Sequence, residues 1–256
     1  MNDEDLKSTE QFQAALQENG DQPVSLTVKR GAKTLSLTAT PVGGSDGVYR
    51  LGAWVRDSMA GIGTMTYYDP QSGTFGALGH GITDVDTAQL MPISSGSLMP
   101  STVISVTKGK NGTPGELTGD FETDVELGSL TCNSAGGVFG KLTDTSMVCG
   151  EPVPVARRDE VRCGNATILA NVNGDRVEEF SIKITKFVEN GENGRDMLIR
   201  ITDERLLSKT GGIVQGMSGS PILQNGRIVG AVTHVLVSDP TRGYAILMEN
   251  MLANES

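Results

Sequence analysis

The chain has 256 residues, of which 37% are hydrophobic and 20% charged, and its formal net charge is −10. Lys and Arg are scattered and form no basic block. Because nucleic-acid phosphates bind to a basic face, we do not expect a nucleic-acid partner. No segment approaches the ~18 apolar residues of a membrane span, and the first residues, MNDEDLKSTEQ, have no apolar signal core. We expect neither an anchor nor an export signal in this chain itself.

Metal-binding residue types are scarce. The chain has three cysteines, Cys132, Cys149 and Cys163, and two histidines, His80 and His234. No CxxC pair is present, so the ligand set is too poor for a structural zinc site. We expect no metal and no organic cofactor. The cysteine count allows one disulfide, but buried reduced thiols are favoured.

Residues 1–42 predict a small α/β segment. Ser8 begins a capping box, and its hydroxyl is expected to accept the amide N–H of Gln11. Apolar side chains then recur at helical spacing as far as Leu16, and Gly20 ends the helix.

A β-hairpin is expected after the helix. Apolar and polar residues alternate over 24–28 and again over 35–39, with an Arg-Gly-Ala turn between them. The Gly-rich segment 42–47 then breaks the pattern. We therefore predict a first domain at 1–42 and a second at 43–256.

The second domain consists of short β-like runs separated by turns. Many short strands without a convincing long helix indicate a mainly β barrel or sandwich. The predicted strands are 51–55, 64–68, 102–106, 167–172, 180–187, 197–201, 227–237 and 244–247.

The most informative motif is G-x-S-G-x-P, at residues 216–221. A serine nucleophile needs a tight turn with an exposed hydroxyl and free amides, which flanking glycines permit. The amides of Gly216 and Ser218 are candidates for an oxyanion hole, worth ~2.7–4 kcal/mol per donor. A simple turn is the alternative for an isolated motif. Here, however, the stretch 211–235 continues through a hairpin into an apolar strand, and it resembles the end of the second barrel of chymotrypsin-like serine proteases.

A base and an orienting carboxylate must accompany the serine. His80 follows a β-like run between small residues, which suits a side chain in a cleft, although a buried structural histidine is the alternative. His234 lies on the strand that would line the cleft and is expected to contact substrate. Asp84, Asp86 and Asp203 are the candidate carboxylates, and the sequence geometry does not choose among them.

Three motifs in order resemble one family. GIGTMTYYDP at 61–70, FGALGHGITD at 75–84 and IVQGMSGSPI at 213–222 are similar to the SpoIVB peptidase family, over residues 43–252. The resemblance implies a mainly β fold, a chymotrypsin-like double β-barrel preceded by a partial PDZ-like α/β segment at 1–42.

The same resemblance implies a serine endopeptidase that works through an acyl-enzyme. His80 matches the base, Asp203 the orienting carboxylate and Ser218 the nucleophile. Gly216 and Ser218 would supply the oxyanion hole. Thr233 and His234 would lie in the substrate cleft, because their strand matches the one that lines the specificity pocket.

The family's setting implies partners and a location. Its members are exported and membrane-anchored, and they act between the mother-cell and forespore membranes. The implied substrate is a membrane-bound sporulation regulator, whose cleavage activates a late sigma factor. Self-association through the PDZ-like segment is a further expectation. The alternative functions are a non-catalytic protein-binding module and a spore-envelope assembly module.

Two departures from digestive proteases bear on activation and specificity. Met217 replaces the acidic residue that commonly precedes the serine, so activation by a buried N-terminal ammonium is not expected. Gly212, six residues before Ser218, replaces an acid, which disfavours a pocket that selects Lys or Arg by charge.

Overall fold

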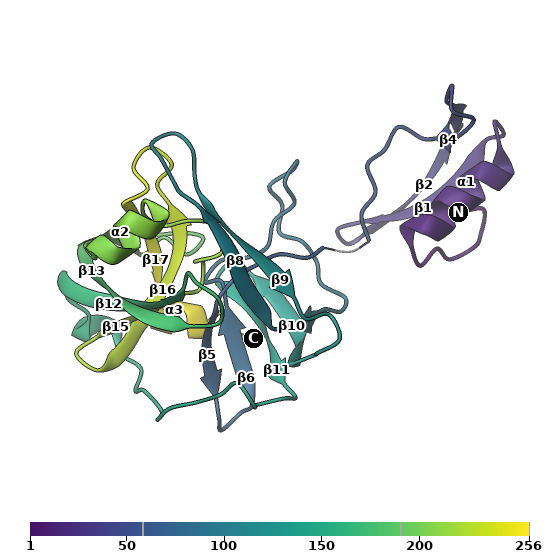
Figure 1. Cartoon of the computed structure of the whole chain (residues 1–256). Coiled ribbons are helices and arrows are strands. Elements are labelled where there is room, and N and C mark those ends of the chain that lie inside the picture. Colours follow the sequence, from purple (N-terminus) through teal and green to yellow (C-terminus); the bar gives the residue numbers. More distant parts are fainter. Residues whose placement is uncertain (58, 190, 256) are drawn as a thin grey trace. The chain divides into compact units, whose positions relative to one another are not determined.

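The computed structural model describes residues 1–57, 59–189 and 191–255, and it contains two compact units, 1–61 and 62–256. Strands dominate the larger unit, whereas the smaller one combines a helix with short strands (Figure 1). Within the described residues, no helix has the length and apolar character needed to cross a membrane.

The first unit contains one helix and two strand pairs: α1 (Thr9–Asn19), β1 (Val24–Arg30), β2 (Lys33–Ala39), β3 (Val42–Gly43) and β4 (Tyr49–Arg50). β1 and β2 form an antiparallel hairpin, and β3 pairs with β4. The predicted helix and the predicted hairpin are both confirmed.

The helix begins and ends as its sequence requires. The Ser8 hydroxyl accepts the Gln11 N–H at 3.2 Å, which satisfies one of the free amides of the first turn. Gly20 has φ 63°, and its N–H donates to the Leu16 carbonyl at 3.1 Å. A left-handed residue at this position favours glycine.

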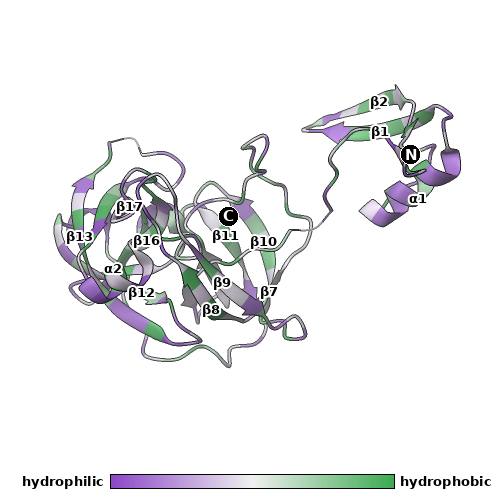
Figure 2. Cartoon of the chain, turned by 45° about the horizontal axis from the view of Figure 1, so that its top comes forward, coloured by the Kyte–Doolittle hydropathy of each residue, from purple (hydrophilic) through white to green (hydrophobic). Residues whose placement is uncertain are grey.

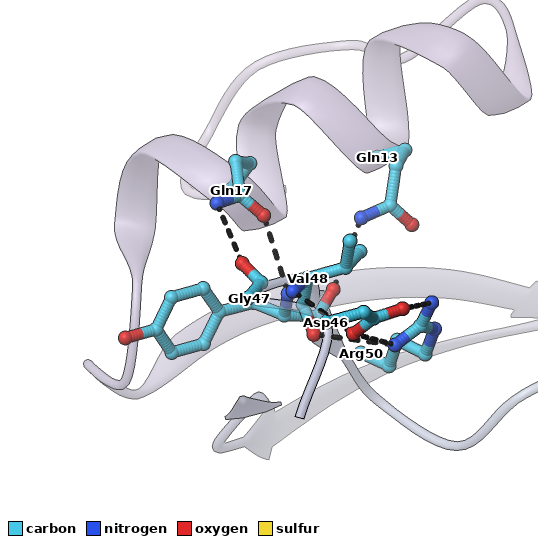
Figure 3. Close-up of polar contacts among 7 residues, drawn as sticks. Gln13, Gln17, Asp46, Gly47, Val48 and Arg50 are labelled. Carbon is cyan, nitrogen blue, oxygen red and sulfur yellow. Dashed lines mark hydrogen bonds and ion pairs between the residues drawn. The ribbon is translucent and has the colours of Figure 1, made fainter. Parts of the chain in front are cut away.

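The compact units divide at 61/62, whereas the sequence places the boundary at 42/43. The reason is that residues 46–50 fold back onto α1 (Figure 3). Gln17 accepts the Tyr49 N–H and donates to the Gly47 carbonyl, each at 3.2 Å, and Gln13 donates to the Tyr49 carbonyl at 3.0 Å. The predicted strand at 51–55 is wrong, because these residues pair with no other strand and Trp54 is 91% exposed.

The second unit contains a closed six-stranded barrel in the order β12-β13-β14-β17-β16-β15, with every neighbouring pair antiparallel. The barrel strands are β12 (Gly164–Asn171), β13 (Val177–Phe187), β14 (Met197–Ile201), β15 (Pro221–Gln224), β16 (Arg227–Val235) and β17 (Arg242–Leu247).

A five-stranded sheet, β5-β6-β11-β10-β7, and a separate hairpin, β8-β9, precede the barrel in the chain. Their strands are β5 (Met65–Asp69), β6 (Thr74–Ala77), β7 (Ser97–Leu98), β8 (Ser101–Thr107), β9 (Glu116–Phe121), β10 (Gly128–Ser134) and β11 (Gly137–Leu142). The helices of this unit are the 3-10 turn η1 (Arg158–Glu160), α2 (Glu204–Thr210) and α3 (Met248–Leu252).

The barrel interior is the main core. Along β13 buried and exposed residues alternate, with Phe180, Ile182 and Ile184 at most 2% exposed, and Figure 2 shows the matching alternation of hydropathy. This is the pattern of a strand with one face on a core. β16 differs, since Ile228 to Thr233 are all buried. β16 is therefore covered on both faces.

Asp196 connects the barrel to the C-terminal helix. The carboxylate lies just before β14, is 7% exposed, and accepts hydrogen bonds at 2.8 Å from both the Leu247 N–H and the Asn250 side-chain amide. Because Leu247 precedes α3, one buried carboxylate fixes the start of β14 against the start of this helix.

We predict that Asp196→Ala lowers the free energy of unfolding by about 1–3 kcal/mol, since it leaves the buried Leu247 N–H and the partly buried Asn250 amide without their acceptor. Urea unfolding followed by circular dichroism measures this loss. Asp175→Ala, at an exposed position, is the matched control and should change stability little. Equal stability of the two variants would contradict the role of Asp196.

Candidate active site

Ser218 lies in the loop between α2 and β15, between two glycines with positive φ. Gly216 has φ 97° and Gly219 has φ 95°. A Cβ at Gly219 would collide with the Thr64 carbonyl and would approach the Leu78 nitrogen to 2.6 Å. Only glycine therefore fits after the serine.

Backbone contacts hold this loop against the five-stranded sheet. The Thr64 N–H donates to the Ser218 carbonyl at 2.9 Å, and the Thr66 hydroxyl donates to the Gly219 carbonyl at 2.8 Å. Thr66 is buried, so the bond is shielded from water. The loop that carries Ser218 is thus held in place by the residues at the start of β5.

The amides around Ser218 differ in their pairing. The N–H groups of Met217, Gly219 and Ser220 donate to the backbone carbonyls of other residues. Within the described part of the chain, the N–H groups of Gly216 and Ser218 have no hydrogen-bond acceptor. The two amides that the sequence nominates for the oxyanion hole are therefore available for a ligand.

His80 follows β6 through a tight turn in which Leu78 and Gly79 both have φ 68°. Its Nδ1 lies 2.9 Å from the Gly81 carbonyl, so Nδ1 carries the proton and Nε2 keeps a lone pair. A Cβ at Gly79 would approach Thr233 Cγ2 to 2.9 Å. The histidine turn is therefore packed directly on β16.

The two histidines of the chain contact each other. The ring centroids of His80 and His234 are 4.8 Å apart, with an angle of 38° between the planes. His234 Nδ1 is buried without a hydrogen-bond partner in the described residues. Burial lowers the pKa of His80, and the Arg195 charge lowers it further. Burial, then His80 and Arg195, lower the pKa of His234 to about 4. Both rings are therefore neutral at pH 7.

Thr233 joins three parts of the site. Its carbonyl accepts the Ser218 hydroxyl at 2.8 Å, and its own hydroxyl donates to the Gly194 carbonyl at 2.6 Å. Thr233 is 3% exposed and immediately precedes His234. The structure thus brings Ser218, Thr233, His234 and His80 together, with the Ser218 hydroxyl donated to Thr233 rather than to His80.

Within the described residues, Asp203 forms no hydrogen bond with His80. It is the N-cap of α2, where Oδ1 accepts the Arg205 N–H at 3.0 Å, and Arg205 Nη2 reaches Oδ2 at 2.9 Å. Oδ2 also accepts the Ser181 N–H at 3.2 Å. The hydrogen bond from Arg205 is the largest cause that lowers the pKa of Asp203, to about 2.

Of the two candidate carboxylates that follow His80 in the sequence, Asp84 and Asp86, the first forms a local turn. Asp84 Oδ1 accepts the Asp86 N–H at 3.1 Å, and it accepts both the N–H and the hydroxyl of Thr87 at 2.9 Å. This is an Asx-type turn, which fixes the backbone shortly after His80.

The positions that bear on specificity are tightly packed. Met217 is 1% exposed and belongs to the barrel core, which explains an apolar residue before the serine. Gly212 has φ 144°, and a Cβ there would collide with the Pro240 carbonyl. No acidic side chain fits at this position. Cys132, Cys149 and Cys163 are free thiols, but Cys149 and Cys163 are exposed, so the expectation of buried thiols is wrong for these two.

The SpoIVB peptidase S55 family model matches residues 47–252. No curated protein matches the chain. Among solved structures, the active form of the Rv3671c protease from M. tuberculosis aligns at 13% identity with a TM-score of 0.40, over 62% of this chain and 78% of that one. The inactive form of the Rv3671c protease aligns at 16% identity with a TM-score of 0.39, over 62% and 84%.

The position of Asp203 predicts a difference between two substitutions. Asp203→Ala removes the cap and should lower the free energy of unfolding by about 0.5–2 kcal/mol, whereas Asp203→Asn keeps a good cap and should cost less. The stabilisation from the carboxylate is present above its ordinary pKa of 3.8 and is lost as the pH falls toward about 2.

Urea unfolding at pH 7 and pH 3 measures both effects. Activity assays on the two folded variants then separate the cap from a catalytic role. A folded Asp203→Asn protein that is as inactive as Asp203→Ala would contradict a role confined to the cap.

Proposed function

Because the chain belongs to the SpoIVB peptidase S55 family and is a serine peptidase, we propose that it is an endopeptidase that cleaves protein substrates through an acyl-enzyme on Ser218. One set of contacts supports the assignment: the Ser218 hydroxyl donates to the carbonyl of Thr233, whose neighbour His234 contacts His80, and among the described residues the N–H groups of Gly216 and Ser218 have no acceptor. Acyl transfer needs a serine hydroxyl, a neutral base and free amides, and these contacts support the presence of all three.

The reaction begins when the Ser218 hydroxyl leaves the Thr233 carbonyl and donates to His80 Nε2. His80 takes this proton as the serine oxygen bonds to the substrate carbonyl carbon. The oxyanion that forms is bound by the amides of Gly216 and Ser218. Imidazolium His80 then protonates the leaving amine, which leaves an acyl-enzyme, and water repeats the cycle to release the acid and restore the serine proton.

We propose that two groups orient the ring of His80. At rest the Gly81 carbonyl holds Nδ1, and this bond alone selects the productive tautomer. The second is Asp203, which the resemblance of its motif to the family implies, and whose present bonds fix the start of α2 and thereby the segment that leads to Ser218. A direct contact of Asp203 with His80 requires that α2 rearrange at its N-terminus.

The architecture supports the same function. The second unit is mainly β, with a closed six-stranded barrel and a curled sheet, consistent with the chymotrypsin-like protease fold. We propose that these are the two barrels of that fold, in a peptidase domain at 43–256. We also propose that 1–42 are the C-terminal half of a PDZ-like domain, supported by the helix and hairpin, and that this segment allows self-association.

The physiological role follows from the family alone. We propose that the substrate is a membrane-bound sporulation regulator, cleaved between the mother-cell and forespore membranes so that a late sigma factor becomes active. A non-catalytic binding or spore-envelope assembly module is the alternative. It requires that a Ser218→Ala protein work normally in cells, whereas the peptidase requires that this variant fail.

Labelling with a fluorophosphonate probe tests the nucleophile. We expect the adduct on Ser218, none in Ser218→Ala, and a rate reduced by about 10²–10⁴ in His80→Ala, because a general base contributes that much. Ser220→Ala is the matched control, since the Ser220 hydroxyl is buried and has no hydrogen-bond partner among the described residues. An adduct on Ser220, or none on a folded wild-type protein, would refute the assignment.

The pH dependence of labelling tests the base. Only neutral His80 accepts a proton, and burial and Arg195 lower its pKa below the ordinary 6.5. The labelling rate should therefore rise with pH through a midpoint below 6.5 and remain constant above it. Arg195→Gln should move the midpoint upward, because it removes a nearby positive charge. A wild-type midpoint above 6.5 would count against His80 as the base.

A further inference from the structure

Arg195 lies beside the paired histidines, in the loop between β13 and β14. Its guanidinium carbon is 5.8 Å from the ring centre of Tyr244, and Tyr244 is opposite His234 in the β16–β17 pairing. Arg195 is half-buried, and none of the ion pairs of the described residues includes it. A cation without a carboxylate thus lies next to the site.

The residues on both sides of Arg195 are fixed to the site. The Gly194 carbonyl accepts the Thr233 hydroxyl, and the Asp196 N–H donates to the Ala245 carbonyl at 2.9 Å. A Cβ at Gly194 would collide with the Gly79 carbonyl, so this loop touches the turn that carries His80. The guanidinium is therefore held near both histidines by a backbone with little freedom, and its charge is one cause of their lowered pKa values.

Charge at this site contrasts with the rest of the chain. The protein has a net charge of −10, yet the titratable groups beside Thr233, which accepts the Ser218 hydroxyl, are the paired histidines and Arg195. Gly212, packed against Pro240, has no space for an acid. A substrate carboxylate would complete the coordination of the guanidinium. His234 Nδ1, which is buried without a partner among the described residues, would supply a second donor in its Nδ1–H tautomer.

We propose that Arg195, together with His234, makes the peptidase selective for substrates with an acidic side chain within a few residues of the scissile bond. The inference rests on Ser218 as the nucleophile, since it locates the scissile bond. Substrate bound at Ser218 would lie close to His234, because Thr233, its neighbour, contacts the Ser218 hydroxyl. Arg195 acts on binding and orientation, and no proton passes through it.

Two local features must be separated from this role. Arg195 also stacks on Tyr244, a contact that Arg195→Lys weakens while it keeps the charge. Glu192 is in the same turn, where its carbonyl accepts the Arg195 N–H at 3.2 Å, and its carboxylate is the nearest exposed one in sequence. Glu192→Gln should therefore strengthen the acid preference or leave it unchanged.

The test uses peptide pairs that differ only by Glu against Gln at each of three positions on either side of the cleaved bond. At one of these positions we expect kcat/KM to favour Glu by about ten-fold or more, the size of a charge-assisted hydrogen bond. Arg195→Gln should reduce this ratio to about one, Arg195→Lys should keep part of it, and Arg195→Glu should favour Lys. Arg200→Gln, on the exposed face of β14, is the matched control.

Each peptide is also tested as a competitor of fluorophosphonate labelling of Ser218, so that the result does not depend on turnover. A protein that is labelled but cleaves and binds Glu and Gln peptides equally would overturn the acid preference and leave the peptidase assignment intact. If Arg195→Gln still cleaves the Glu peptide faster than the Gln peptide, a residue other than Arg195 causes the preference, which would overturn the proposal. A folded protein without a Ser218 adduct would overturn the proposed function and this inference with it.

Discussion

The site depends on the two hydrogen bonds of Thr233. Its carbonyl accepts the Ser218 hydroxyl at 2.8 Å, and its hydroxyl donates to Gly194 at 2.6 Å. Because Thr233 is buried and lies on a strand covered on both faces, it is a rigid reference point. The nucleophile loop, the histidine turn at Gly79 and the loop of Arg195 all pack against it. A change at Thr233 would therefore displace the proposed nucleophile, the proposed base and Arg195 together.

This arrangement describes a resting peptidase. Burial keeps both histidines neutral, which leaves His80 able to accept a proton, and the Gly81 carbonyl fixes the proton on Nδ1. The serine proton is held by a carbonyl that cannot take it. Catalytic hydrogen bonds often tighten only when substrate binds. We infer that a rotation of the Ser218 side chain, with the barrel strands unchanged, brings its hydroxyl from Thr233 to His80.

Sequence reasoning succeeds where a pattern has one physical cause. The alternation that predicts a strand at 180–187 and the glycines around Ser218 belong to this class. Strands β10 and β11 were missed because GSLTCNS and GVFGKL mix glycine with polar residues, and α2 was missed because it has seven residues. An Asp after a strand suits either a helix cap or a histidine partner, so the sequence could not assign Asp203. Arg195 was missed because ENGENGRD is typical of a solvated turn, and only the fold places it beside His80.

A crystal structure of the phosphonylated protein would test the central claim most directly. The account predicts phosphorus on Ser218 Oγ, the Thr233 carbonyl released, a phosphonyl oxygen within hydrogen-bond distance of the Gly216 and Ser218 amides, and His80 Nε2 facing the adduct. The same structure would show whether Asp203 has left the cap of α2. An adduct on another residue, or a phosphonyl oxygen that contacts neither amide, would contradict the account.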